Sequence, residues 1–270
     1  MRATVVVDNK PAGGLTGEWG LCIYIEYEGK NILLDAGASD LFVKNAERLG
    51  LWLEDVDAAV LSHAHYDHAN GMEAFFRRND HAKFYLRAGS APNCYFRRWP
   101  IRRYIGIPKT ILVDFPDRIV PVEGTVELFS GVWLLPHSTP QLDAVGRREH
   151  MYLRTPNGWT ADDFSHEQSL IFDTDKGLVI FNSCSHGGAV NIINEAAAAF
   201  PEKHVHALIG GFHLYNKPLA EVRALGEKIR ATGIEYVCTG HCTAEKPYAV
   251  LKQTLGDTLH QLQTGLVMEF

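Results

Sequence analysis

The sequence has no run of roughly eighteen apolar residues, the length that a membrane-spanning helix requires. Its N-terminal stretch, residues 3–9, has neither the length nor the flanking charge of a signal peptide. The five cysteines are odd in number and show no Cys-x-x-Cys spacing, which argues against a disulfide framework and against a structural zinc knuckle. We therefore expect a cytoplasmic protein without a membrane partner.

An excess of positive charge is also absent, since 26 lysines and arginines stand against 32 acidic residues. The formal net charge is −6, so no global basic field favours a nucleic-acid partner. The local exception is the segment 97–103, in which four arginines flank Trp99. Such a cluster can bind a phosphate or another anionic substrate, or it can be a solvated loop, and the sequence does not decide between these interpretations. The expected partner is a small molecule, anionic or phosphorylated, and not a nucleic acid.

The most informative segment that is present is His-Ala-His-Tyr-Asp-His at residues 63–68, directly after the apolar run 58–62. One turn can aim His63 and His65 at one cation, while Asp67 and His68 project toward a second position. Neutral imidazole and carboxylate suit zinc, iron or manganese. The alternative, a polar loop that happens to be rich in histidine, accounts less well for this spacing and for the position after a strand.

Apolar periodicity predicts alternating strands and helices, and 270 residues with 46% hydrophobic content can bury one sizeable core. Strands are expected at 3–7, 21–27, 31–34, 58–62, 83–87, 126–129, 132–135, 169–173, 178–182, 206–209, 236–239 and 265–270. Helices are expected at 39–49, from 71 to 76, at 189–200 and at 218–232. Between about 88 and 121 the pattern weakens into Pro, Gly and Arg-rich sequence, which predicts an inserted flap over the site.

The pattern H-x-H-x-D-H resembles the signature of the metallo-β-lactamase superfamily, and the stretch 32–37, ending in Asp35-Ala36-Gly37, resembles a strand and turn of the same superfamily. There the aspartate supports the metal-binding loop from behind the ligands. Without the resemblance, Asp35 is an ordinary turn aspartate before glycine. The resemblance implies one domain over residues 1–270, of class α/β, folded as a four-layer αββα sandwich.

Three later turns narrow the resemblance to one branch. Residues 181–188, 210–214 and 239–243 resemble the Gly-Cys-Ser-His, Gly-Gly-Phe-His-Leu and Gly-His-Cys-Thr-Gly turns of the branch named for 7,8-dihydropterin-6-methyl-4-(β-D-ribofuranosyl)aminobenzene-5′-phosphate synthase. The chain departs from these patterns at Ser183 and Ala244, where glycine is usual. Neither change removes a ligand.

The resemblance implies two divalent metal ions, with zinc as the first choice and iron or manganese as alternatives. The implied ligands are His63, His65 and His186 for one ion, and Asp67, His68 and His241 for the other. Cys184 stands where many superfamily members have an aspartate that bridges both ions, so it is either a thiolate ligand or a small buried hydrophobe. His166 is a rival to His186, and His137 is a weaker candidate.

The implied chemistry is hydrolysis of an ester, amide or phosphoester bond by metal-activated water, with Asp67 orienting the solvent. His213, after two glycines, is expected to face the substrate as a base or an oxyanion donor, or else to support the ligands from behind. The branch implies a second possibility, a pterin-linked transferase, and a non-catalytic or redox metal-binding protein is the third. Neither Ser183 nor Ser185 lies in a Gly-x-Ser-x-Gly elbow, which argues against a serine hydrolase.

Overall fold

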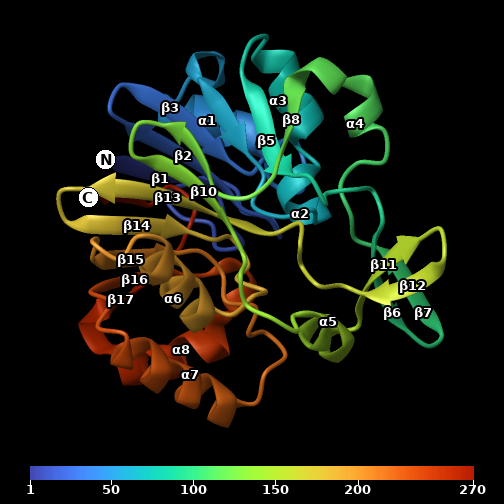
Figure 1. The fold of residues 1–270 in the computed structure, drawn as a ribbon. Helices are drawn as coiled ribbons and strands as arrows, with labels where there is room; N and C mark the ends of the chain where they lie inside the picture. The colour runs from blue at the N-terminus through green and yellow to red at the C-terminus, as the bar shows by residue number, and fades with distance from the viewer.

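Two seven-stranded sheets lie face to face at the centre of the computed structural model, which describes residues 1–270 (Figure 1). The first sheet has the order β18-β1-β2-β3-β4-β5-β8 and the second β17-β16-β15-β14-β13-β10-β9. The strands of the first sheet are β1 (Arg2–Val7), β2 (Cys22–Tyr27), β3 (Lys30–Leu34), β4 (Ala58–Val60), β5 (Lys83–Arg87), β8 (Ile119–Val122) and β18 (Val267–Glu269). Those of the second are β9 (Val126–Phe129), β10 (Val132–Pro136), β13 (Gln168–Thr174), β14 (Gly177–Phe181), β15 (Val205–Ile209), β16 (Tyr236–Thr239) and β17 (Leu259–Gln261).

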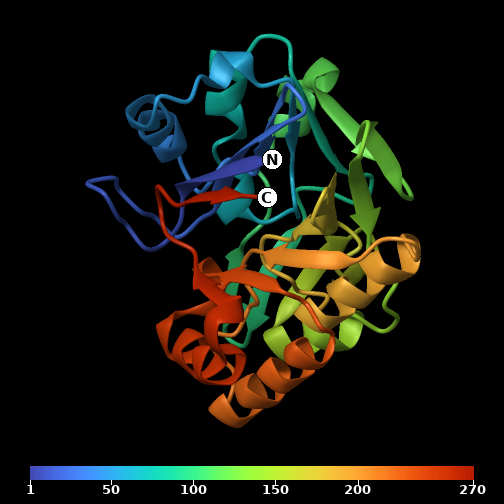
Figure 2. The same ribbon diagram turned by 90° about the vertical axis from the view of Figure 1, so that its left-hand side faces the viewer.

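Helices cover the outer face of each sheet. Near the first sheet lie α1 (Leu41–Leu49), α2 (Tyr66–Ala69), α3 (Met72–Arg78) and α4 (Ile111–Asp114). The second sheet is covered by α6 (Ala189–Ala199), α7 (Leu219–Ala231) and α8 (Glu245–Leu255), as the turned view also shows (Figure 2). The longest of these helices, α7, has 13 residues, and none is long and apolar enough to cross a bilayer.

The buried apolar side chains confirm the layer order. Ile32 and Leu34 of β3 belong to the cluster between the two sheets, whereas Leu33 belongs to the cluster under α1 and α3. Successive side chains of a strand point to opposite faces, so a central strand with an apolar cluster on each side is apolar throughout. A third cluster, which includes Ile180 and Ile229, lies between the second sheet and its helices. The fold is the predicted αββα sandwich.

A third, four-stranded sheet stands beside the sandwich, and two of its strands lie within the segment 88–121, where weak periodicity predicted an inserted flap without regular strands. It has the order β12-β11-β6-β7, with β6 (Cys94–Arg98), β7 (Ile101–Tyr104), β11 (Met151–Thr155) and β12 (Gly158–Ala161), and α5 (Asp143–Glu149) leads into β11. The β11–β12 hairpin lies far along the chain from the β6–β7 hairpin. Pairing between such distant segments leaves no local signal in the sequence of either one. The predicted flap also contained β8, which is an edge strand of the first sheet.

Two further elements were missed near the C-terminus, α8 and β17. Helix α8 carries Pro247 in its first turn, where the missing amide hydrogen costs nothing because it has no partner within the helix. The C-terminal strand β18 pairs with β1, with Ala3 opposite Met268. The two ends of the chain therefore lie side by side, as Figures 1 and 2 both show.

Candidate metal centre

The predicted ligands come from strand ends that meet at one edge of each sheet. Strands β3 and β4 run parallel, so Asp35 and the segment 63–68 emerge at the same edge of the first sheet. Strands β14, β15 and β16 are also parallel, and their carboxyl ends lead to His186, His213 and His241. The two edges face each other across the sandwich. This topology is what brings residues from distant parts of the sequence together.

The first ligand cluster consists of His63, His65 and His186. Their ring centroids form a triangle with sides of 4.6, 5.0 and 5.0 Å. One ring nitrogen from each lies within 4.8 Å of the others. All three residues are buried. The structure thus brings together the three histidines that the sequence assigns to one ion.

The second ligand cluster consists of Asp67, His68 and His241, whose ligating atoms also lie within 4.8 Å of one another. The Nε2 atoms of His68 and His241 are 3.2 Å apart, and Asp67 Oδ2 is 3.5 Å from His241 Nε2. Two nitrogens on one tetrahedral zinc ion, each at 2.0–2.1 Å, would be about 3.3 Å apart. The observed separation therefore fits two nitrogens that share one cation.

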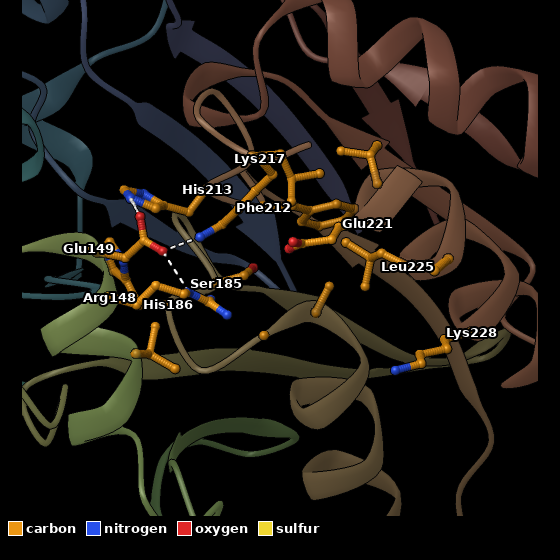
Figure 3. A pocket seen from close by; sticks show the side chains of 16 residues that line it. Arg148, Glu149, Ser185, His186, Phe212, His213, Lys217, Glu221, Leu225 and Lys228 are labelled. Carbon is orange, nitrogen blue, oxygen red and sulfur yellow. Dashed lines mark hydrogen bonds and ion pairs between the residues drawn. The ribbon is translucent and has the colours of Figure 1, made fainter. Parts of the chain in front are cut away.

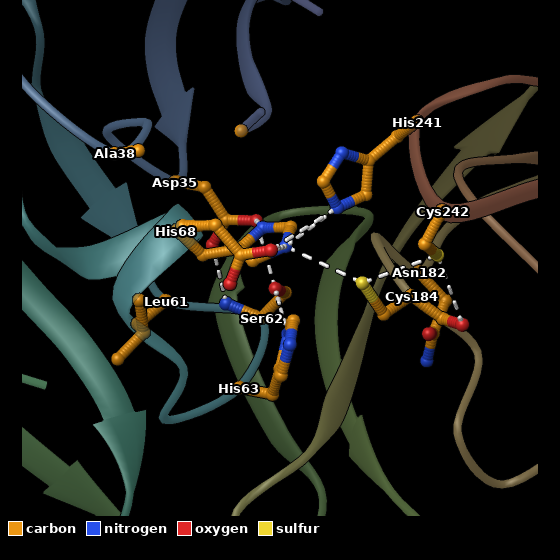
Figure 4. Close-up of polar contacts among 12 residues, drawn as sticks. Asp35, Ala38, Leu61, Ser62, His63, His68, Asn182, Cys184, His241 and Cys242 are labelled. Atoms are coloured by element: carbon orange, nitrogen blue, oxygen red, sulfur yellow. Dashed lines mark hydrogen bonds and ion pairs between the residues drawn. The ribbon is translucent and has the colours of Figure 1, made fainter. Parts of the chain in front are cut away.

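Asp35 holds the second cluster from behind, as predicted for the turn aspartate. Its carboxylate accepts hydrogen bonds of 2.7 Å from the amide and from the hydroxyl of Ser62. One carboxylate oxygen also lies 2.7 Å from His68 Nδ1 (Figure 4). A proton on Nδ1 that is donated to Asp35 leaves the Nε2 lone pair of His68 free for a cation. Asp35 thus selects the tautomer that a ligand needs.

His241 is oriented by two residues that the sequence analysis did not identify. The amide of His241 donates to Asp8 Oδ2, and its Nδ1 lies 3.0 Å from Asn9 Oδ1. This contact again leaves Nε2 free to face His68. Asp8 and Asn9 directly follow β1, so their position after a strand was the signal that could have marked them.

The first ligand cluster is electrically neutral. Burial and the neighbouring imidazoles lower the pKa of His63 and of His186, and together with His166 they lower the pKa of His65 to about 4. Their free nitrogens stay unprotonated at neutral pH. Both ring nitrogens of His186 and the Nε2 atoms of His63 and His65 are buried without a hydrogen-bond partner. Buried polar atoms are normally satisfied, so this group of lone pairs fits a cation.

The second ligand cluster carries charge. Burial raises the pKa of Asp67, but nearby His68 and His241 outweigh it and hold the pKa below its usual range. Burial lowers the pKa of His241, but Cys242 and Asp67 beside it raise the pKa to about 9. Burial and Cys242 raise the pKa of the Cys184 thiol.

The two rival histidines are engaged elsewhere. His166 Nδ1 accepts a hydrogen bond from the amide of Ala64, and its Nε2 lies 3.1 Å from Asp162 Oδ2. With both ring nitrogens occupied, His166 supports the segment that carries His63 and His65. His137 is paired with two carboxylates, described next.

A buried carboxylate clamp holds the turn that carries His186. Glu167 accepts hydrogen bonds from the amides of His186 and Gly187, each at 3.0 Å, and also pairs with His137 Nε2. The other nitrogen of His137 lies 2.9 Å from Glu195, which accepts further bonds from Ser138 and Thr139. Neither glutamate was identified from the sequence, because Glu167 precedes a strand and Glu195 lies within a helix without a motif.

Backbone strain is concentrated around the two ligand clusters. Asp35, Ser185, His213 and His241 all have positive φ values, between 46° and 60°. Residues with a side chain rarely adopt this left-handed region, and such residues gather at functional sites. Gly210 relieves crowding nearby, since a Cβ there would lie 2.0 Å from the carbonyl oxygen of Asn182.

Two cavities flank the site, and His186 and His213 line both. The first, of about 350 Å³, extends toward α7 and contains Glu149 and Lys217 (Figure 3). Glu149 pairs with Lys217, and its Oε2 lies 3.9 Å from His213 Nε2. Neither ring nitrogen of His213 has a hydrogen-bond partner.

The second cavity, of about 490 Å³, is the cleft above the ligands. His65, Asp67 and His186 line it together with Cys184 and Cys242. Its other walls are Trp19, Tyr66, Phe96, Ile101, Arg103, Ile105, Met151, His213 and Tyr215. Four of these residues belong to the third sheet or its hairpins, so that sheet forms one wall of the cleft.

Comparison with known proteins agrees with the resemblance inferred from the sequence. Residues 16–146 match the family model of the metallo-β-lactamase superfamily. The 7,8-dihydropterin-6-methyl-4-(β-D-ribofuranosyl)-aminobenzene-5′-phosphate synthase of Methanocaldococcus jannaschii is 25% identical over 267 residues, covering 93% of this chain and 90% of that protein. The crystal structure of a metal-dependent hydrolase of the β-lactamase superfamily is 26% identical with a TM-score of 0.86, over 100% of this chain and 99% of that chain. A diphosphatase of the PhnP family has a similar fold, with a TM-score of 0.57 at 16% identity over 100% of this chain and 98% of that chain.

Proposed function

We propose that this chain, which belongs to the metallo-β-lactamase superfamily, is a metal-dependent hydrolase of small anionic molecules. The observation that carries the proposal is the meeting of unpartnered, buried imidazole nitrogens beside the Asp67 carboxylate at the base of one cleft. The structurally similar metal-dependent hydrolase supports the same reaction class.

The six ligands would hold two divalent ions, for which zinc is our first choice. Such an ion, when bound, lowers the pKa of a coordinated water toward neutrality and polarises the carbonyl or phosphoryl oxygen under attack. Asp67 stays ionised at neutral pH and faces the cleft, so it can hold the attacking water by a hydrogen bond. His213 has free ring nitrogens on the cleft wall and can donate a proton to the leaving group.

The walls of the cleft suggest the substrate class. Trp19, Tyr66, Phe96 and Tyr215 offer flat apolar surfaces, and Arg103 is the cation among the lining residues outside the histidines. The Arg103 guanidinium lies over the ring of Tyr66 at 5.5 Å and has no carboxylate partner among the ion pairs of the protein. A substrate with a flat apolar part and a phosphate or carboxylate group would match both features.

Elemental analysis and a substrate panel test the proposal together. Protein purified without added metal is analysed for bound ions and assayed with aryl phosphates, phosphodiesters, lactones and thioesters. We expect up to two ions per chain and turnover of at least one anionic class. His81→Ala, at an exposed histidine far from the cleft, is the matched control for His65→Ala. Wild-type protein that binds no divalent ion would falsify the proposal.

The second candidate is a transferase of the kind that the archaeal relative's name describes. Its support is the 25% identity that extends over 93% of this chain. A pterin diphosphate incubated with and without an aminobenzene acceptor distinguishes the two reactions. Release of diphosphate without acceptor favours hydrolysis, whereas a condensed product that forms only with acceptor favours the transferase.

A further inference from the structure

The third sheet, which projects from the sandwich in Figure 1, divides the arginine segment 97–103 between its two faces. Successive side chains of a strand point to opposite faces. Arg103 lines the cleft. Arg102, its neighbour in β7, therefore points away from the cleft, as does Arg97, which lies directly opposite Arg102 in the pairing of β6 with β7. Arg97 and Arg102 thus belong to the outer face of the sheet, the face that points away from the cleft.

Three guanidinium groups gather on this outer face around one indole ring. The Cζ atoms of Arg97, Arg102 and Arg154 lie 5.1, 5.9 and 5.2 Å from the centroid of the Trp159 ring. All three arginines are exposed, and Arg154 lies directly opposite Trp159 in the pairing of β11 with β12. The four strands of the sheet contain neither aspartate nor glutamate. The outer face therefore concentrates positive charge without an acidic residue in its strands to offset it.

These three arginines also lack the partners that arginines have elsewhere in the protein. Every arginine outside the third sheet contacts a carboxylate, carbonyl or amide oxygen. No such contact involves the guanidinium group of Arg97, Arg102 or Arg154. Like charges that surround one ring repel one another, so an anion that binds among them relieves the repulsion. Guanidinium groups bind phosphates through paired hydrogen bonds.

A hollow beside these arginines supplies flat apolar walls. It has a volume of about 530 Å³, and Trp99, Tyr152 and Trp159 line it together with Arg97 and Arg102. Trp99 is 95% exposed, more than any other large hydrophobic residue of the protein. Aromatic rings and guanidinium planes stack on nucleobases. A ligand in which a flat base is joined to phosphates therefore matches both the rings and the charges of the hollow.

We propose that the outer face of the third sheet is a second ligand site, which binds the base and the phosphates of a nucleotide. Trp99 and Trp159 stack on the base, and Arg97, Arg102 and Arg154 bind the phosphates. Three guanidinium groups favour a di- or triphosphate over a monophosphate. No residue of the two ligand clusters lines this hollow, so the site is separate from the metal centre and does not depend on the proposed hydrolase.

Other occupants fit the outer face less well. An acidic peptide would pair with the guanidinium groups but offers no flat ring to the exposed indoles. Two copies of this face would repel each other through their arginines. A nucleic-acid duplex keeps its bases stacked inside, so only its backbone would reach the sheet. A single strand presents the same chemistry as a free nucleotide, but the net charge of −6 gives it no attraction to the rest of the surface.

Calorimetric titration of the full-length protein with ADP, AMP and inorganic diphosphate tests the site. We expect one ADP per chain on the outer face, bound several-fold more tightly than AMP or diphosphate. Arg97→Gln and Arg102→Gln should each weaken ADP about 10-fold, because each removes hydrogen bonds between charged groups. Trp99→Ala should weaken ADP about 5-fold or more and leave diphosphate unchanged, because only the base contacts the indole.

The chain offers a matched control for each kind of variant. Arg77→Gln removes an exposed arginine that pairs with Glu73 on α3, and Trp52→Ala removes a tryptophan that is 66% exposed. Neither should change the affinity for ADP. A single-stranded oligonucleotide distinguishes the two sources of the ligand. Tighter binding than ADP, weakened by the same variants, identifies a strand, whereas weaker binding identifies the free nucleotide.

Three results would overturn the inference. The first is that the wild type binds neither ADP nor the oligonucleotide. The second is equal affinity for ADP and diphosphate, with no effect of Trp99→Ala, since charge alone would then explain the binding. The third is ADP binding that His65→Ala abolishes and Arg97→Gln leaves unchanged, which would place the nucleotide in the cleft. None of these results counts against the metal-dependent hydrolase, whose test is the metal content and the substrate panel.

Discussion

The two ligand clusters adjoin each other, yet their side chains differ in the hydrogen-bond and ion-pair partners that the protein gives them. The first contains imidazoles alone, and its free nitrogens have no partner in the protein. In the second, Asp67 pairs with His241, while Asp35 and Asn9 hold the far sides of the two imidazoles. We therefore expect a bound cation to stabilise the first cluster more than the second, which is partly neutralised by its own side chains.

The prediction with the largest expected effect compares two variants, each of which lacks one ligand of one cluster. Loss of a group behind a ligand typically costs about 10- to 100-fold, so loss of a ligand should lower turnover by roughly a thousandfold. His186→Ala should release the first ion and, with it, most activity. His241→Ala should keep one ion per chain. Metal content and kcat/KM for both variants, with His81→Ala as control, check this. Equal loss of both ions in both variants would mean that the clusters act as one site.

The second prediction concerns the tautomer of His68. Asp35→Asn replaces one acceptor oxygen with an amide that cannot accept the proton of His68 Nδ1. The second ion should be held about 10- to 100-fold less tightly, and the first should be unaffected. Competition with a chromophoric chelator measures both affinities. A variant with unchanged affinity for both ions would show that Asp35 serves the turn alone.

Most of this arrangement could be predicted from the sequence, because its parts are local motifs. The two triads were implied by a family resemblance that rests on short motifs at strand ends, and parallel strands bring those ends to one edge. The supports behind them were harder to find. Glu167 and Glu195 lie in segments without a motif, and only the folded chain shows that Glu167 accepts the amide of His186 and that Glu195 pairs with His137 beside it.

The third sheet was missed for a similar physical reason. Its strands β6 and β11 pair across a long separation in sequence, with Phe96 opposite Met151. Arginines stand next to each other in both β6 and β7, as Arg97-Arg98 and Arg102-Arg103, so these strands lack the apolar periodicity of the core. These strands form one wall of the cleft, which was therefore the part of the site least accessible to sequence reasoning.

The third prediction compares the two glutamates of the clamp. Glu167 and Glu195 both pair with His137, but only Glu167 accepts the amides of the turn that carries His186. Glu167→Gln places an amide donor against one of those backbone donors, so affinity for the first ion should fall about 10-fold. Glu195→Gln should cost stability while leaving this affinity unchanged. The same chelator competition, with thermal unfolding alongside it, distinguishes the two. Matching losses of affinity would indicate a general packing effect.

The smallest effect concerns how this clamp responds to pH. Burial lowers the pKa of His137, but Glu167 and Glu195 outweigh it and raise the pKa to about 10, above the value of about 6.5 expected in the unfolded chain. The folded protein therefore binds this proton more tightly. The resulting stabilisation is complete below about pH 6.5 and is lost as the pH rises through about 10. In metal-free protein, the free energy of unfolding should fall over this range by on the order of 2–3 kcal/mol more in wild type than in His137→Gln. Urea unfolding at pH 6, 8 and 10 measures the difference. If the difference in unfolding free energy between wild type and His137→Gln were the same at all three pH values, the charge of His137 would not contribute to the clamp. The first ligand cluster would then depend on its cation alone.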